Sequence, residues 1–268
     1  MIDTLLMYCL LNVEQSRQKL AMQKELKFAE RIQKSMVPTT FPHFPERKGF
    51  DVHASMTPTR EVGGDFYDFF MIDDDHLGLV IADVSDKGIP AAMCMMSTKT
   101  IISNNMMMGK TPGDVLADTN KTFCEHNDEC MFVTAWIATL EISTGKLTCA
   151  NAGHEYPMIK QGAAGFRLFE DKHGSPIGWI ETSKYEEYEI MLSPGDMIFV
   201  YTDGITEAKN KKREMFGTDR IIEVLNSAAY TDCEKMLHSV FDEVNTFAGE
   251  VEQFDDLTML ALEYKGGY

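Results

Sequence analysis

The sequence lacks an uninterrupted run of about eighteen apolar residues, the length that a membrane-spanning helix requires. It also lacks the pattern of a signal peptide, because Asp3 interrupts the apolar start, no basic segment precedes it and no small-residue cleavage site follows. No C-x-x-C pair occurs, and the cysteine spacing fits neither a small disulfide scaffold nor a zinc site; the six are Cys9, Cys94, Cys124, Cys130, Cys149 and Cys233. We therefore expect a protein of the reducing cytoplasm.

Positive charge is scarce. The chain has 25 Lys and Arg residues against 42 Asp and Glu, which gives a formal net charge of −17 and a pI near 4.8. This balance opposes the counterion release that drives most binding to nucleic acids, so no nucleic acid partner is expected. The hydrophobic fraction of 44% is typical of a globular protein, and 268 residues suffice for one catalytic domain with an appendage.

Glycine and proline are absent from residues 1–36, where apolar residues recur at helical spacing. The pattern predicts one long helix with a phase slip near Ala21, and its apolar stripe comprises Leu6, Leu10, Val13, Leu20, Met22, Leu26, Ala29, Ile32 and Met36. Pro38, Pro42 and Pro45 then end the helix. Such a stripe indicates a coiled-coil segment or interdomain linker, or else packing on the body of the same chain. We divide the chain into a helical linker, residues 1–40, and a globular domain, residues 41–268.

Beyond Gly49 the sequence changes to short runs of β-branched and aromatic residues bounded by Gly, Pro and Asp. The predicted strands are 50–56, 66–72, 77–84, 132–142, 146–150, 157–160, 185–192, 197–201 and 257–264. The predicted helices are 91–108, 112–126, 218–227 and 233–247, and Thr111 with Asp114 is placed to cap the second. Blocks of strands separated by helix pairs favour antiparallel sheets covered by helices over a doubly wound parallel fold.

Two acidic motifs accompany the first predicted strands. In Glu61-Val-Gly-Gly-Asp65-Phe-Tyr-Asp68, the two glycines allow a tight turn that delivers Asp65 at the start of a strand. In Val80-Ile-Ala-Asp83-Val-Ser-Asp86-Lys-Gly88, a nearly all-apolar strand ends in an aspartate, and a buried carboxylate requires a partner such as a metal ion. Taken alone, an aspartate in either position is more often a turn residue that caps a helix or loop.

Two later segments repeat this design. Ile198-Phe-Val-Tyr-Thr-Asp203-Gly204 is an apolar strand that runs into aspartate and glycine, and Phe254-Asp255-Asp256-Leu-Thr258 places paired aspartates before the last strand. Four aspartates beside apolar strands can converge on one edge of a sheet sandwich. Hard oxygen ligands with waters suit Mg²⁺ or Mn²⁺ rather than zinc. Two such ions would activate a water molecule and clamp a phosphoryl group.

The motifs E-V-G-G-D-F-Y-D, A-D-V-S-D-K-G-I-P-A-A, N-A-G-H, T-D-G-I-T-E-A and D-D-L-T follow one another along the chain. In this order they resemble those of bacterial PPM/PP2C-type serine/threonine phosphatases related to the sporulation phosphatase SpoIIE and the stress-response phosphatase RsbU. The resemblance spans Ala29 to Tyr264. It implies an α-β-β-α sandwich of two mainly antiparallel sheets with a two-metal site between them. The chain departs from the pattern at Asp86, where many members have glycine.

The resemblance also implies roles for single residues. By motif match, Asp83 bridges both ions, with the Val84 carbonyl beside it. Asp203 and Asp255 ligate one ion, and Asp65 serves the other in part through water. Asp256 ranks below these as a ligand, because its position often carries a neutral amide in eukaryotic relatives.

The activity that the resemblance implies is hydrolysis of phosphoserine or phosphothreonine by metal-activated water, without a covalent phosphoenzyme. The implied substrate is a phosphorylated anti-anti-sigma (STAS-domain) protein in a partner-switching pathway. In relatives, the N-terminal helix joins a sensor to the phosphatase and promotes dimerisation. An upstream sensor domain and a homodimer are therefore expected, and the chain would be the cytoplasmic part of a longer, membrane-attached receptor. Two alternatives stay open: a regulatory or binding module of the same fold, and a phosphatase of small phosphate esters.

Two further residues are candidates for substrate contact. Arg60 lies five residues before Asp65, where the phosphate-binding arginine of eukaryotic PP2C enzymes would be, and a guanidinium fork suits a phosphoryl group. A solvated surface arginine is the competing interpretation. His154, in Asn151-Ala-Gly-His154, could touch substrate or donate a proton to the leaving oxygen, although a lone His in a turn is more often structural.

Overall fold

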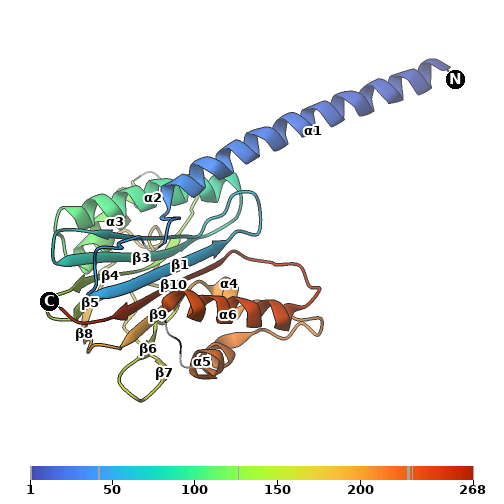
Figure 1. The fold of residues 1–268 in the computed structure, drawn as a ribbon. Coiled ribbons are helices and arrows are strands. Elements are labelled where there is room, and N and C mark those ends of the chain that lie inside the picture. The colour runs from blue at the N-terminus through green and yellow to red at the C-terminus, as the bar shows by residue number, and fades with distance from the viewer. Residues whose placement is uncertain (1, 42, 126, 228–229, 231, 268) are drawn as a thin grey trace.

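A computed structural model describes residues 2–41, 43–125, 127–227, 230 and 232–267, and in the first helix the side chains of Met7 and of residues 10 onward (Figure 1). Within this range, ten strands form two five-stranded sheets in which all neighbouring strands are antiparallel. The sheets pack face to face, and helices cover their outer faces. The predicted α-β-β-α sandwich is thereby confirmed.

The first sheet has the order β1-β10-β9-β6-β7, with β1 (Phe50–Thr57), β6 (Met158–Lys160), β7 (Phe166–Leu168), β9 (Met197–Tyr201) and β10 (Leu257–Tyr264). The second has the order β2-β3-β4-β5-β8, with β2 (Phe66–Met71), β3 (His76–Val84), β4 (Val133–Glu141), β5 (Lys146–Ala152) and β8 (Glu187–Met191). The second sheet is covered by α2 (Ile89–Met107) and α3 (Pro112–Cys124), and the first by α5 (Gly217–Ser227) and α6 (Cys233–Ala248). The other described helices are α1 (Ile2–Met36) and the one-turn α4 (Asp203–Thr206).

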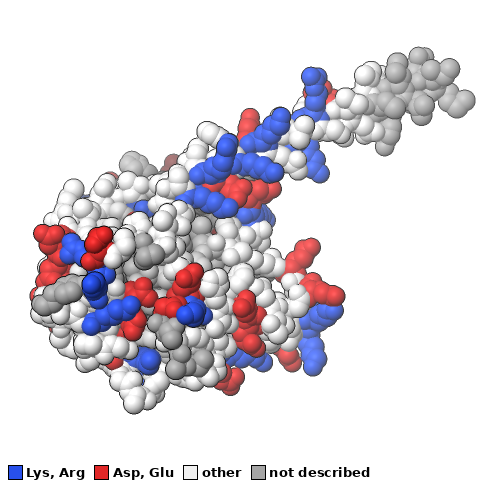
Figure 2. All heavy atoms as spheres, in the orientation of Figure 1, with Lys and Arg blue, Asp and Glu red and all other residues white. Residues whose placement is uncertain are grey.

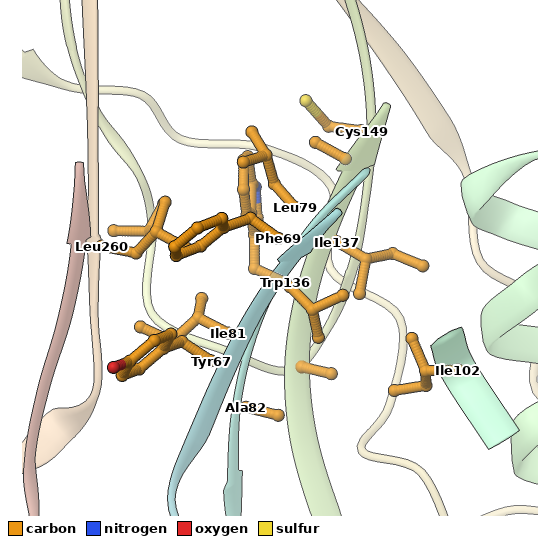
Figure 3. Packing of buried hydrophobic residues seen from close by; sticks show 14 of the residues in the cluster. Tyr67, Phe69, Leu79, Ile81, Ala82, Ile102, Trp136, Ile137, Cys149 and Leu260 are labelled. Carbon is orange, nitrogen blue, oxygen red and sulfur yellow. The ribbon is translucent and has the colours of Figure 1, made fainter. Parts of the chain in front are cut away.

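The main core lies between the two sheets and extends to α2. Figure 3 shows Tyr67, Phe69 and Ile81 on the face of the second sheet that is directed toward Leu260 of the first sheet. On the opposite face of the second sheet, Ile137 is directed toward Ile102 of α2 (Figure 3). Since successive side chains of a strand point to opposite faces, a strand covered on both sides is apolar at nearly every position. This explains the unbroken apolar run that ends in the second acidic motif.

The predicted elements are present with shifts of up to two residues at their described ends, which is ordinary for helix and strand boundaries. The sequence analysis missed β7 and α4. A strand of three residues is too short to display a two-residue period, and α4 is a single turn that begins at Asp203 itself. Pro42, expected to help end the first helix, and His126, expected to end the helix after Thr111, lie outside the described residues.

Helix α1 projects from the body, and Lys and Arg side chains gather along its middle (Figures 1 and 2). The exposed members of its apolar stripe are Leu10, Val13, Leu20, Met22 and Ile32; the side chain of Leu6 lies outside the described part. Only the last turns reach the body, where the buried Gln33 donates to the Gly63 carbonyl oxygen at 2.6 Å and accepts from the Gly63 N–H at 3.1 Å. Packing on the body therefore applies to the end of the helix alone. None of the described helices combines the length and apolarity needed to cross a membrane.

Candidate active site

Four of the predicted aspartates meet where the two sheets face each other. Asp65 and Asp83 belong to the second sheet, one just before β2 and the other near the end of the adjacent β3. Asp203 and Asp255 belong to the first sheet, one just after β9 and the other just before the adjacent β10. Each sheet thus contributes a pair of carboxylates from neighbouring strands, and the charges of Asp203 and Asp255 are close enough to raise the pKa of Asp83.

Asp65 is the most enclosed of the four, with 2% of its surface exposed. Burial raises its pKa well above the usual range, and the nearby charges of Asp83 and Asp256 raise it further. Thr202, which follows β9 in the other sheet, donates its hydroxyl to Asp65 Oδ2 at 2.7 Å. This hydrogen bond ties the two sheets together at the acidic centre.

Two partly buried carboxylates of the centre, Asp83 and Asp203, also have a raised pKa. Burial raises the pKa of Asp83 to about 7, with Asp203 and Asp255 adding to the effect. Burial also raises the pKa of Asp203 to about 6, with the charges of Asp255 and Glu207 contributing. A carboxylate resists ionisation where water is excluded and other anions are near, and a bound cation reverses that resistance. The centre is therefore poised to accept positive charge.

Lys87 already supplies part of this charge. Its Nζ lies 2.9 Å from Asp255 Oδ2, donates to the carbonyl oxygen of Phe254, and lies 4.2 Å from the centroid of the Phe254 ring. The same ammonium lowers the pKa of Asp203 against the effect of burial. Lys87 thereby connects the turn after β3 to the segment before β10. Sequence analysis did not select it, although it stands within the second acidic motif.

Asp256 makes different contacts from its neighbour. Its two carboxylate oxygens accept the backbone N–H groups of Thr59 at 2.7 Å and of Gly64 at 3.1 Å, so it holds the turn that delivers Asp65. A Cβ at Gly63 would lie 2.0 Å from Asp256 Oδ2, and one at Gly204 would lie 1.9 Å from its carbonyl oxygen. Both glycines are required by this close approach. Asp256 thus has a structural role in holding the turn before Asp65, and its role as a metal ligand stays a prediction.

The Val84 carbonyl and Arg60 border the same centre. A Cβ at Gly64 would lie 2.8 Å from the carbonyl oxygen of Val84, so this carbonyl faces the glycine turn next to Asp65. The exposed Arg60 side chain reaches the turn after β3, since a Cβ at Gly88 would lie 3.5 Å from its Nη1. Arg60 thus lies in solvent beside the turn after β3, and its contact with a phosphoryl group stays a prediction.

His154 lies beneath the centre rather than in it. Its ring is 3% exposed, its Nδ1 lies 2.9 Å from the hydroxyl of Thr134, and its backbone N–H donates to Asn151 Oδ1. Thr134 is the residue opposite Asp83 in the pairing of β3 and β4. Burial lowers the pKa of His154 to about 3, so the ring is neutral near pH 7. Through these contacts, His154 supports Thr134, the residue of β4 that pairs with Asp83. A catalytic role for His154 stays a prediction.

The donor chemistry of the centre suits hard divalent cations. Carboxylate and carbonyl oxygens are the ligands that Mg²⁺ and Mn²⁺ prefer. Among the described residues, no group of three or more His, Cys, Asp or Glu side chains is arranged in this structure so that it could hold a metal ion. Mg²⁺ usually keeps several of its waters, so it needs fewer protein ligands than a cage of side chains provides.

Comparison with known families agrees with the geometry. The sequence profile of the family described as Stage II sporulation protein E (SpoIIE) matches residues 73–265. The chain therefore belongs to the SpoIIE family and carries a phosphatase domain of the SpoIIE/PP2C type.

Individual relatives extend over most of the chain. It is 31% identical to Protein IcfG of Synechocystis over 267 residues, which are 89% of this chain and 41% of that protein. It is 28% identical to Phosphoserine phosphatase RsbU of Bacillus subtilis over 244 residues, 90% of this chain and 70% of that one. The chain thus spans well under half the length of IcfG and a larger share of RsbU.

Solved structures share the fold. The SiaA-PP2C domain of Pseudomonas aeruginosa has a TM-score of 0.80 at 19% identity, covering 92% of this chain and 98% of that one. The structure of RsbX in complex with magnesium has a TM-score of 0.62 at 13% identity, covering 81% of this chain and 96% of that one.

Proposed function

We propose that the chain is a metal-dependent protein phosphatase that hydrolyses phosphoserine or phosphothreonine. The observation that carries the proposal is the crowding of Asp65, Asp83, Asp203 and Asp255 from two sheets, which raises the pKa of three of them. Folding gains nothing from such crowding unless a cation compensates it. The naming of the relative RsbU as a phosphoserine phosphatase supports the reaction, and the magnesium in the RsbX structure supports the type of ion.

Each residue of the centre has a separate role in the proposed reaction. Asp83 with the Val84 carbonyl, Asp65, Asp203 and Asp255 would hold two divalent cations, Mn²⁺ or Mg²⁺. When bound, these ions supply the positive charge that activates water and neutralises the phosphoryl group. Thr202 keeps the Asp65 carboxylate oriented. Arg60, at the rim, would bind and orient the phosphoryl oxygens through its guanidinium fork.

For the substrate, we propose a phosphorylated STAS-domain protein of a partner-switching pathway, acted on in the cytoplasm. Residues 1–40 would form a linker between an upstream sensor and the phosphatase domain, residues 41–268, and would pair in a homodimer. The exposed apolar stripe of α1 supports this role.

Hydrolysis of a phosphoserine protein, with and without Mn²⁺, tests the activity. We expect phosphate release that requires Mn²⁺ or Mg²⁺ and stops in excess chelator, because the carboxylates alone repel a phosphate dianion. A nucleotide and a small aryl phosphate, assayed in parallel, should be much poorer substrates. Full activity in chelator would contradict the metal mechanism, and preference for the small ester would contradict a protein substrate.

Replacing Arg60 by Ala is expected to lower kcat/KM for a phosphoserine peptide by about tenfold, equivalent to roughly 1.4 kcal/mol. The physical reason is the loss of a bidentate cation at the rim. Arg47→Ala is the matched control, because Arg47 is a surface arginine whose described ion pair, with Asp74, lies on another loop. Kinetics of Arg60→Ala equal to those of the control would assign Arg60 to the solvated surface.

A further inference from the structure

A pocket adjoins the acidic centre on the side of α6. It lies between the end of α6, the segment 249–255 and the segment 204–209. Gly204 and Asp255 line it, and both are immediate neighbours of the carboxylate cluster: Gly204 follows Asp203, and Asp255 belongs to the cluster. The pocket therefore borders the place that a phosphorylated residue would occupy in the centre.

The lining of the pocket is mixed: beside an apolar part it includes the polar residues Asn245, Gln253 and Lys209. Val244 of α6 and Leu257 of β10, both buried, contribute to its lining, together with Ala208, Ala248 and Val251. Glu207 and Glu252 also line it. The two carboxylates would repel an acidic side chain, whereas an aliphatic side chain would contact the apolar part of the lining.

Phe254 forms one wall, and its position is unusual for this residue type. It is 64% exposed, yet it lines the pocket and immediately precedes Asp255. Lys87 lies 4.2 Å from the ring centroid and Lys209 lies 5.3 Å from it. Cation–π attraction from two ammonium groups holds an aromatic ring in solvent. Because Lys87 also binds Asp255 at 2.9 Å, the ring is fixed relative to the acidic centre.

We propose that this pocket is a specificity subsite that receives an apolar side chain of the phosphoprotein, from a residue flanking the phosphoserine. The proposal rests on the proposed function and adds the chemistry by which the substrate segment is recognised. Three observations carry it: the shared lining with the acidic centre, the apolar part of that lining, and the exposed Phe254 ring beside Asp255.

The test compares short phosphoserine peptides in which Leu is placed in turn at each flanking position, with Ser, Glu or Arg as the alternatives there. At one flanking position, we expect Leu to exceed Ser in kcat/KM by about tenfold or more, the discrimination typical of an apolar pocket. Phe254→Ala, which removes the wall, and Ala248→Leu, which fills the interior, should both reduce this Leu-to-Ser ratio toward one. Since the ratio is taken within each variant, any general loss of activity cancels.

Met191→Ala is the control, because Met191 is an apolar residue of similar exposure, 58%, on β8 at the far edge of the second sheet. It should keep the wild-type ratio. An equal rate for Leu and Ser at every position, or a preference for Arg at the expense of Leu, would overturn the proposal. So would a Leu preference that both pocket variants retain.

Fluorescence anisotropy of the same labelled peptides separates this proposal from the proposed function. If the wild type hydrolyses no phosphoserine peptide but binds the Leu peptide better than the Ser peptide, and Phe254→Ala abolishes that difference, the activity is refuted and the subsite stands. If hydrolysis proceeds and neither binding nor rate depends on the flanking residue, the subsite is refuted and the activity stands. Absence of both refutes both.

Discussion

Replacing Asp83 by Asn is expected to lower kcat/KM for a phosphoserine substrate by about 100-fold or more, equivalent to roughly 2.7 kcal/mol of transition-state stabilisation. Asp83 is the carboxylate that we propose serves both ions, and the charges of Asp203 and Asp255 both raise its pKa. An amide keeps the shape but removes the negative charge. Asp203→Asn should have a similar effect. Asp118→Asn, which alters the surface ion pair between Asp118 of α3 and Lys110, is the control and should change activity little.

The melting temperature of Asp83→Asn, measured at two pH values, shows whether the variant has lost only a metal ligand or has misfolded. Burial raises the pKa of Asp83 from 3.8 to about 7, so in the metal-free protein this carboxyl stabilises the fold only while it is protonated. That contribution is complete below about pH 4 and is lost as the pH rises through 7. In excess chelator at pH 8, Asp83→Asn should therefore melt at a higher temperature than the wild type, and the two should converge near pH 4. A lower Tm for the variant at pH 8 would attribute its inactivity to a damaged fold.

Charged substitutions in the stripe of α1 are expected to convert a dimer to a monomer. Leu10, Val13 and Leu20 are exposed on a helix that projects from the body, and we propose that a second copy of the helix covers them. With Leu10, Val13 and Leu20 all changed to Glu, the mass in solution should halve and the specific activity should fall. A version starting near Thr40 should behave likewise. A monomeric wild type with the same specific activity as the truncated chain would refute this role.

The route from α1 to the centre is also testable. Gln33 makes two hydrogen bonds to Gly63, and the next residue, Gly64, donates to Asp256. A rotation of α1 would therefore reach the turn that carries Asp65 through hydrogen bonds of the Gln33 side chain to the Gly63 backbone. Gln33→Leu should keep the dimeric mass but reduce activity, because pairing is intact and its transmission is lost. If Gln33→Leu keeps full activity, the coupling passes instead through α2, which α1 also contacts.

The sequence allowed most of the fold and the four main carboxylates to be predicted, for identifiable reasons. Asp83 and Asp203 end apolar runs, so their burial was evident from neighbours along the chain. The contacts of Lys87 and Gln33 were not predictable, since each depends on a partner distant in sequence, Asp255 for one and Gly63 for the other. Paired aspartates at 255 and 256 look alike in a motif, yet packing directs them to different contacts. The sequence around a residue indicates whether it is buried, whereas the residues that it contacts are known only from the fold.

The pairing of β1 with β10 has a consequence for the time at which activity appears. Phe50–Thr57 lie against Leu257–Tyr264, and β10 is the only neighbour of β1 within the described sheet. During translation, β1 is synthesised about two hundred residues before its partner β10, so it has no strand to pair with until β10 is made. The pairing of β1 with β10 is therefore a slow, non-local step of folding. Asp255 arrives with that strand. A nascent or prematurely terminated chain therefore holds an incomplete acidic centre, and catalytic competence begins only when synthesis of the domain is nearly finished.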